Sequence, residues 1–322
     1  MPDPRLEPLA KIAKTTKIIP AVIEVVDIAG LVRGASKGEG LGNKFLQHIR
    51  EVDAIVQVVR CFENKDVVHV SGRLDPVADI ETVTTELVLA DLETVARTRE
   101  KAERIARGGD RDALAAVAAA DRLLPHLDDG KPASTLVLTE DEGTAARRML
   151  LLTSKPVLFV ANVAEDDLAR SDVIAEVLAV RDYAKTHLGT EAVVVSAAIE
   201  AELAELPEAE AAEYLAGLGV AESGVGVLIH AAYHLLGLRT FLTAGEKEVR
   251  AWTIHAGDKA PAAAGVIHTD FEKGFIKAET VSYGDLAACG SMASAREKGL
   301  VRQEGREYVV ADGDVMLFKF NV

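Results

Sequence analysis

The sequence is poor in cysteine and has no long hydrophobic run. It contains two cysteines, Cys61 and Cys289, which lie far apart and belong to no Cys-x-x-Cys pair. This argues against both a disulfide framework and a zinc site. No stretch approaches the roughly 18 consecutive apolar residues of a membrane span, and the N-terminus shows no charged-then-apolar signal segment. We therefore expect a cytoplasmic protein.

Positive charge is also scarce. The chain carries 36 lysine and arginine residues against 51 aspartate and glutamate residues, a formal net charge of −15. This excess opposes non-specific nucleic-acid binding, because phosphate contacts need basic residues gathered on one face. Residues 238–322 hold 11 basic and 12 acidic residues, which leaves −14 for residues 1–237. If any part of the chain binds RNA or a ribosome, electrostatic repulsion opposes binding by the C-terminal part less than binding by residues 1–237.

Apolar, β-branched segments are present in a regular arrangement. Four of them are predicted to be buried strands: 18–26, 54–59, 157–160 and 192–195. Helical patterns lie between them, including 41–49 and 174–184. This alternation is typical of a doubly wound α/β domain, in which ligands bind at the carboxyl ends of parallel strands.

The interval 79–152 breaks this rhythm with helical patterns. Apolar residues recur there at helical spacing, and Gly108-Gly109-Asp110 interrupts them. We expect an antiparallel helical hairpin inserted into the α/β domain. Thr139 and Glu142 have the spacing of a capping box that opens a further helix. Beyond Leu238 the segments become short, which predicts a small mixed α+β domain.

The first chemical signal is Asp27, at the end of the first predicted strand. With Gly30 it forms Asp-x-x-Gly, with which P-loop nucleotide hydrolases present a carboxylate to Mg²⁺ and a backbone N–H to the γ-phosphate. A glycine-rich stretch suited to a mobile switch comes next, over residues 31–43. The alternative interpretation is a strand-to-loop turn in which Asp27 helps to cap the next segment.

The phosphate-binding loop that accompanies such an aspartate is missing. Only 26 residues precede Asp27, too few for a strand, a phosphate loop, a helix and a switch segment. The only Gly-Lys pair, Gly130-Lys131, is followed by Pro132 where the motif requires Ser or Thr. It also falls in the predicted helical insertion, so we reject it as a phosphate site.

Polar residues after the third predicted strand suit a purine base. Asn162, Val163 and Glu165 follow the strand over 157–160. An asparagine amide can both donate to and accept from a purine edge, and a nearby carboxylate can accept from an exocyclic amine. Ordinary loop chemistry is the alternative interpretation of this motif.

Small residues follow the fourth predicted strand. Ser196, Ala197 and Ala198 would let backbone N–H groups approach a base. Alone they too are compatible with ordinary loop chemistry. Their order and spacing behind Asp27, together with the asparagine motif, favour nucleotide binding.

His69 is the candidate catalytic residue. It lies just after the second predicted strand, where a neutral imidazole can orient an attacking water or stabilise charge on a transferring phosphoryl group. The alternative is a loop histidine with no role. The remaining histidines show no metal-ligand spacing.

Together these segments resemble the Obg-like ATPase family, also called the YchF family, over nearly the whole chain. The resemblance rests on residues 26–43, 60–63, 69–72, 162–165, 241–245, 268–275 and 312–315. It implies three parts. They are a P-loop NTPase-type α/β domain (1–76 and 153–237), the helical hairpin insertion (77–152) and a C-terminal TGS domain of β-grasp type (238–322).

The resemblance also implies an ATPase, able to take GTP, that uses Mg²⁺ and acts on ribosomes in translation or the stress response. In this family Leu31 replaces the water-orienting glutamine of small GTPases, and catalysis falls to His69. Asp27 would contact Mg²⁺ through water. Nucleotide binding would involve Asp27, Gly30, Asn162, Val163, Glu165, Ser196, Ala197 and Ala198. The motif lacks the Lys-x-Asp pairing that grips guanine, so ATP becomes at least as acceptable as GTP. The TGS domain is the candidate RNA contact.

The N-terminus departs from the family pattern. Residues 1–6 resemble an internal family segment that lies downstream of the P-loop and of the threonine switch. The leading hypothesis is a true start codon about 40–50 residues upstream, the span of the missing elements. For residues 1–322 alone we expect strongly weakened nucleotide affinity and no meaningful turnover. The alternative function is a non-enzymatic ribosome- or protein-binding module with a vestigial nucleotide fold.

Overall fold

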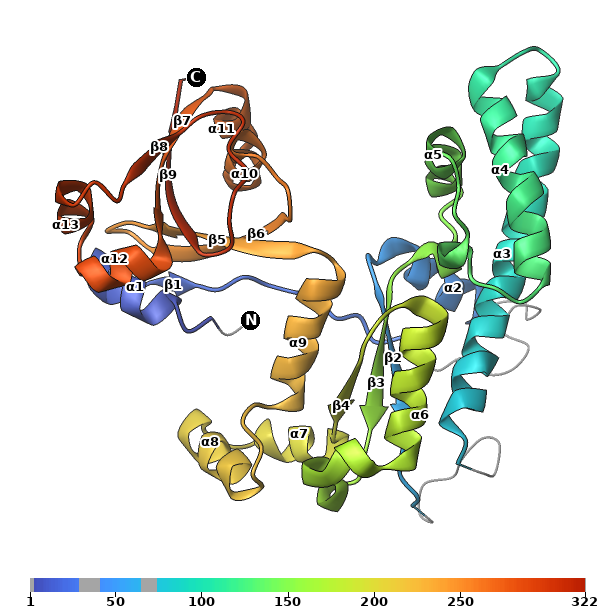
Figure 1. Cartoon of the computed structure of the whole chain (residues 1–322), viewed down its shortest axis with the longest axis horizontal. Helices are drawn as coiled ribbons and strands as arrows, with labels where there is room; N and C mark the ends of the chain where they lie inside the picture. The colour runs from blue at the N-terminus through green and yellow to red at the C-terminus, as the bar shows by residue number, and fades with distance from the viewer. Residues whose placement is uncertain (1–2, 29–40, 65–73, 322) are drawn as a thin grey trace. The chain divides into compact units, whose positions relative to one another are not determined.

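The computed structural model describes residues 3–28, 41–64 and 74–321 (Figure 1). The chain divides into two compact units, one of residues 1–25 with 236–322 and one of residues 26–235. None of the described helices is long and apolar enough to cross a bilayer.

The larger unit combines a parallel sheet with a helical hairpin. Its elements in chain order are α2 (Leu41–Glu51), β2 (Ile55–Arg60), α3 (Pro76–Ala106), α4 (Arg111–Asp128), η2 (Ala133–Thr135), α5 (Glu140–Arg148), η3 (Leu152–Ser154), β3 (Val157–Asn162), η4 (Glu165–Val173), α6 (Ala175–Tyr183), η5 (Ala184–Leu188), β4 (Ala192–Val195), α7 (Ala197–Leu203), α8 (Glu208–Gly217) and α9 (Gly224–Leu235).

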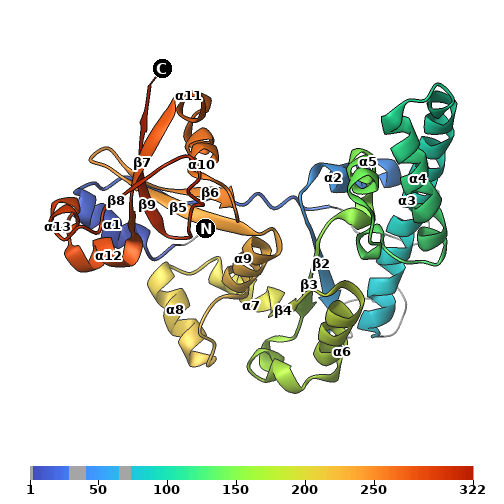
Figure 2. The same ribbon diagram turned by 45° about the horizontal axis from the view of Figure 1, so that its top comes forward.

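The sheet of this unit has the strand order β2-β3-β4, with both pairs parallel. Helices cover its two faces (Figures 1 and 2): Val177 and Val180 of α6 pack on one side, and Val227 and Leu228 of α9 belong to the cluster on the other. This is a doubly wound arrangement. The strands predicted over 54–59, 157–160 and 192–195 are confirmed. β3 and β4 pack apolar side chains on both faces of the sheet, whereas β2 buries Val59 and leaves Val58 63% exposed.

The predicted helical hairpin is formed by α3 and α4, which pack along each other. Gly109 lies at its tip with a φ of 79°, a conformation that glycine adopts at no steric cost. The Asp110 side chain caps α4 by accepting from the Ala113 N–H at 2.8 Å. The predicted capping box of Thr139 and Glu142 is also confirmed at the start of α5.

A buried carboxylate fixes the base of the hairpin to the sheet. Asp91 of α3 has no exposed surface and accepts from the backbone N–H groups of Leu152 and Thr153, both at 2.8 Å. The Thr153 hydroxyl donates to it at 2.7 Å. Burial raises the pKa of Asp91, and these three donors oppose the rise. Because Leu152 and Thr153 lead into β3, the hydrogen bonds couple the position of α3 to that of the sheet.

The smaller unit is built on a mixed sheet with the order β1-β6-β5-β9-β7-β8. Phe241, Phe275 and Phe318 lie in its core, against the alanine face of α10. The elements are α1 (Leu6–Ala13), β1 (Ile18–Ile19), β5 (Leu238–Ala244), β6 (Val249–His255), α10 (Ala260–Ile267), α11 (Thr269–Lys273), β7 (Phe275–Ser282), α12 (Tyr283–Cys289), α13 (Met292–Glu297), β8 (Arg302–Glu304) and β9 (Asp314–Phe320).

The first predicted strand, over residues 18–26, is wrong. Only Ile18 and Ile19 form a strand, β1, and it pairs in parallel with β6 of the smaller unit. Beyond it Val22 and Val25 are 78% and 74% exposed. A run of β-branched residues favours extended backbone but does not choose a hydrogen-bonding partner. Here β6 supplies a partner for two residues, and no described strand pairs with residues 20–28.

The helix before β1 is likewise part of the smaller unit. Leu9 of α1 is fully buried, and α1 contacts β5, β6 and α12. Arg5 donates to Asp312 at 2.7 Å and is held in place by Asp3 at 2.8 Å. Residues 1–25 therefore complete the sheet domain of the C-terminal residues. The expected boundaries between the nucleotide domain, the hairpin and the TGS domain stay a prediction.

Candidate functional site

The carboxyl ends of the three parallel strands form one edge. The register aligns Arg60 with Asn162 and Asn162 with Val195, so β2, β3 and β4 end side by side. Ligands of doubly wound sheets bind at such an edge, because the loops and helix N-termini that follow the strands converge there.

Asn162 is held at this edge by backbone and side-chain hydrogen bonds. Its carbonyl oxygen accepts from the Cys61 N–H at 2.8 Å. Its side-chain oxygen accepts from the Ala197 N–H at 3.0 Å. The structure therefore brings the two predicted base-binding loops together. With the oxygen oriented toward Ala197, the amide nitrogen is the group that can donate to an acceptor such as purine N7.

Val163 differs from its neighbours because its side chain belongs to the core. It is 2% exposed and packs in the cluster between the sheet and α6. Its N–H donates to the Val195 carbonyl at 2.9 Å, which fixes the loop after β3 against the end of β4. Its contribution to the edge is therefore to position the loop.

The loop after β4 presents small residues, as predicted. Ala197 and Ala198 are exposed, so a planar ligand can approach their backbone. Ser196 is 1% exposed, and its hydroxyl has no hydrogen-bond partner among the described residues. A buried hydroxyl without a partner costs about 1–3 kcal/mol. This unsatisfied group marks the loop as a place where a further contact would stabilise the protein.

The next turn is fixed by Glu200 of α7. Its carboxylate accepts from the Gly224 N–H, the first residue of α9, at 2.6 Å. A Cβ atom at Gly224 would lie 2.8 Å from Val195 Cγ1, so glycine is required by this close approach. The start of α9 is thereby packed against the end of β4.

Glu165 is exposed and meets a tyrosine from a distant helix. The Tyr214 hydroxyl of α8 lies 3.3 Å from Glu165 Oε1 and 2.6 Å from Glu202 Oε2 of α7. The hydrogen bond to Glu202 is the largest cause that raises the pKa of Tyr214, to about 12. The sequence motifs gave no indication of Tyr214 or Glu202. Tyr214 is the lone aromatic residue of an alanine- and glutamate-rich helix, and nothing in its spacing points to the loop after β3.

The predicted phosphate and catalytic residues are described only in part. Asp27 is exposed, in a segment without helix or strand. Its neighbour Ile28 is half-buried and packs on the cluster that joins α2 to α3, which anchors the segment. Gly30 and His69 lie outside the described residues.

The loop that leads toward His69 starts from an ordered turn. Arg60, the last residue of β2, donates to the backbone carbonyls of Phe62 at 2.9 Å and Asn64 at 3.0 Å. Its guanidinium also lies 4.9 Å from the centre of the Phe62 ring. Arg60 therefore sets the direction in which the chain leaves the sheet edge.

Asp27 is the described residue that the sequence assigns to magnesium. Mg²⁺ keeps several waters and uses one or two carboxylates together with substrate phosphates. The single exposed carboxylate of Asp27 suits such a contact. Over residues 3–28, 41–64 and 74–321, no group of three or more His, Cys, Asp or Glu side chains is placed to hold a metal ion.

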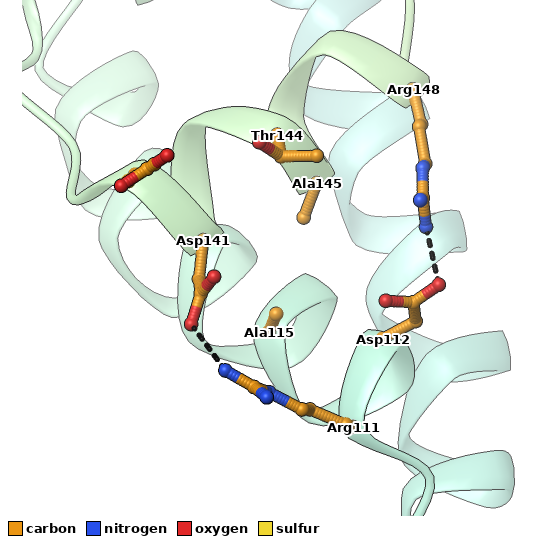
Figure 3. Close-up of a pocket in the computed structure, with 8 residues that line it drawn as sticks. Arg111, Asp112, Ala115, Asp141, Thr144, Ala145 and Arg148 are labelled. Atoms are coloured by element: carbon orange, nitrogen blue, oxygen red, sulfur yellow. Dashed lines mark hydrogen bonds and ion pairs between the residues drawn. The ribbon is translucent and has the colours of Figure 1, made fainter.

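A separate hollow lies between the first turns of α4 and the length of α5 (Figure 3). Two ion pairs line it, Arg111 with Asp141 at 3.5 Å and Arg148 with Asp112 at 2.7 Å. Because both arginines face aspartates, the hollow is not suited to a phosphate. We do not assign it to the nucleotide.

Known proteins resemble the chain over its whole length. It is 51% identical over 322 residues to the ribosome-binding ATPase YchF of Bacillus subtilis, covering 100% of this chain and 88% of that protein. It is 40% identical over 335 residues to Obg-like ATPase 1 of Gallus gallus, covering 100% and 82%.

A solved structure and a family model agree with these relatives. The structure of the Schizosaccharomyces pombe YchF GTPase matches with a TM-score of 0.86 and 36% identity, over 99% of this chain and 86% of that one. A C-terminal YchF-GTPase family model, described as a protein of unknown function (DUF933), matches residues 238–321. The P-loop NTPase-type α/β fold with a C-terminal domain is thereby confirmed.

Proposed function

The chain belongs to the YchF and Obg-like ATPase family of nucleotide hydrolases, and on that premise we propose that it is an ATP-hydrolysing switch that acts on the ribosome. The observation that carries the proposal is the hydrogen bond from the Ala197 N–H to Asn162, which joins two loops suited to a purine. Relatives named ribosome-binding ATPases, about 50% identical over the full chain, support the ribosome as partner.

The residues of the sheet edge have distinct roles in this proposal. Asn162 donates to the purine through its amide nitrogen, and Glu165 accepts from an exocyclic amine. Ser196, Ala197 and Ala198 offer backbone groups to the base, while Val163 holds the loop from the core. GTP is a second substrate that the same edge can accept.

The phosphate chemistry is assigned to Asp27, Gly30 and His69. Asp27 would hold the magnesium of a bound nucleotide through water, and the Gly30 N–H would donate to the γ-phosphate. Magnesium, when bound, neutralises charge on the phosphates. His69 orients the attacking water, because Leu31 has no group that can hold one. Each residue acts by positioning and by electrostatics, as phosphoryl transfer requires.

The unit that contains residues 238–322 is assigned to contact with the ribosome. We propose that it is a TGS domain of β-grasp type that meets ribosomal RNA or protein, in the cytoplasm. With residues 1–25 this unit has 15 basic and 15 acidic residues, a formal charge of 0, against −15 for residues 26–235. This difference supports the assignment, because a phosphate-rich partner repels residues 26–235 more strongly.

The proposal is tested by measuring ATP turnover and ribosome binding of the full-length protein as its gene encodes it. We expect Mg²⁺-dependent release of phosphate from ATP, and co-sedimentation with ribosomes that changes with nucleotide. His69→Ala should lower turnover with ATP binding nearly intact, whereas His234→Ala, an exposed histidine of α9, should change neither. Ribosome binding with no detectable nucleotide binding would instead establish the non-enzymatic module.

A further inference from the structure

The end of the helical hairpin is basic, although the unit to which it belongs is acidic. Residues 97–111, which include the end of α3, the turn and the first residue of α4, hold six basic and three acidic residues. Residues 26–235 as a whole have a formal charge of −15. Figure 1 shows this end of the hairpin pointing away from the sheet of the same unit. We call residues 97–111 the basic tip.

Three basic side chains of the tip share one face of α3. Arg97, Lys101 and Arg104 are exposed and are spaced four and three residues apart, so they follow one another along the helix surface. They span about 10 Å along the helix axis. Val95, on the opposite side of α3, is buried in one cluster with Leu123 of α4. The basic row therefore lies on the face that α3 turns away from α4.

Most of this positive charge has no acidic partner. Arg104 pairs with Glu100. Arg97, Lys101 and Arg107, by contrast, form no ion pair with a described residue. Arg107 continues the row, because it lies three residues after Arg104 and keeps helical dihedral angles of φ −59° and ψ −25°.

Helix stability does not account for this arrangement. Basic residues stabilise the C-terminus of a helix, but the effect is limited to about the last turn. It therefore includes Arg104 and excludes Arg97 and Lys101, since α3 ends at Ala106. Like charges four residues apart, such as Arg97 and Lys101, destabilise a helix. An anionic partner would relieve this repulsion.

We propose that the basic tip binds the phosphate backbone of RNA. A row of cations about 10 Å long suits a chain of phosphates, because one small anion cannot contact all of them. Lysine and arginine side chains that neutralise backbone phosphates release counterions, which supplies affinity without sequence specificity. An RNA duplex is recognised largely through such backbone contacts.

The tip is thereby a second contact with the ribosome, in addition to the smaller unit. The inference extends the proposed ribosome binding, but it does not depend on the purine assigned to the sheet edge. Duplex RNA should therefore bind with or without a nucleotide.

The test is the affinity of the full-length protein for a short RNA duplex, measured at several KCl concentrations. The variant combines Arg97→Gln, Lys101→Gln and Arg107→Gln, since glutamine keeps the helix propensity and removes the charge. We expect binding at low salt to weaken at least about tenfold. The slope of log affinity against log salt should fall in magnitude by about 2–3, because each lost phosphate contact removes about one counterion. Co-sedimentation with ribosomes should weaken as well, with ATP turnover unchanged.

Two controls separate a local contact from net charge. The first removes three positive charges from the same unit where each cation pairs with an aspartate: Lys131→Gln, Arg148→Gln and Arg181→Gln. It should keep the salt slope of the wild type. The second, Arg97→Lys with Arg107→Lys, preserves the charge of the tip and should also keep the slope, because a phosphate contact of this kind depends on charge.

Three results would overturn the inference. They are a wild type that binds no RNA duplex, a tip variant with the wild-type slope, and an equal loss in the first control. A tip variant that loses the ribosome but keeps the duplex has the wild-type slope, and it would assign the tip to an acidic protein partner instead. Phosphate release and ribosome co-sedimentation by the wild type decide the proposed function separately, so either can fail without the other.

Discussion

The side-chain oxygen of Asn162 accepts a hydrogen bond from the Ala197 N–H at 3.0 Å, between the ends of two adjacent strands. The bond uses residues 35 positions apart in the sequence, and it exists because β3 and β4 run parallel and end in register. This hydrogen bond joins the loops after β3 and β4 into one surface, and we assign the purine to that surface.

The assignment of the N-terminal residues to the smaller unit predicts a long-range effect on stability. Leu9→Ala removes a fully buried side chain and should lower the free energy of unfolding of that unit by about 3 kcal/mol. Trp252, the only tryptophan, lies in β6 of the same unit, so its fluorescence reports the transition in denaturant.

The matched control is Leu114→Ala in α4, where the side chain is 51% exposed and belongs to the other unit. It should leave the Trp252 transition in place. A Trp252 transition that Leu9→Ala does not move would show that α1 is not part of that core.

The buried carboxylate at the base of the hairpin makes a second prediction. Asp91→Ala leaves the N–H groups of Leu152 and Thr153 buried without an acceptor, at about 1–3 kcal/mol each. We expect the free energy of unfolding of the larger unit to fall by about 3 kcal/mol or more, measured by urea titration of the helical circular dichroism.

Asp121→Ala is the control for Asp91→Ala. Asp121 forms an exposed ion pair with Arg99 at 2.6 Å, and exposed pairs contribute little. Equal destabilisation by the two variants would contradict a special role for Asp91.

The capping box of α5 predicts a pH dependence. Glu142 accepts from the Thr139 N–H at 2.9 Å and from Arg122 at 2.7 Å, and these bonds lower its pKa below the ordinary 4.5, with the Thr139 backbone bond as the largest cause. A carboxyl group whose pKa is lower in the folded than in the unfolded state stabilises the fold at pH values above its unfolded-state pKa. This stabilisation is lost as the pH falls through its folded-state pKa.

Glu142→Gln should therefore lower the melting temperature at pH 7, and the gap to the wild type should close as the pH falls below about 4.5. Melting curves at pH 7, 4 and 3 measure it. Glu93→Gln removes the same charge at an exposed site of α3 and should show no such trend. A gap that stays constant with pH would exclude the carboxylate as its origin.

Patterns within a short segment of the sequence predicted those elements that depend on residues close together in the chain. Thr139 and Glu142 cap α5 because a capping box needs only residues three positions apart. The strand over 192–195 was correct because a buried parallel strand is apolar on both faces. The strand over 18–26 was wrong because its partner is chosen by β6, more than 200 positions away, and the pattern of a segment does not contain that information.

The same distinction applies to the site. Asn162 and Ser196 could be predicted because Asn162 ends β3 and Ser196 follows β4, and parallel strands end at one edge. Tyr214 could not, because its contact with Glu165 and Glu202 depends on how α8 packs, which no spacing within α8 shows.

The most direct test of the account is the affinity of the native gene product for Mg·ATP, compared between the wild type and Asn162→Ala. We predict measurable binding by the wild type and a loss of at least about tenfold in the variant, because Asn162 both donates to the purine and positions the Ala197 loop. Equal affinities, or no binding by the wild type, would contradict the assignment of the purine to this edge.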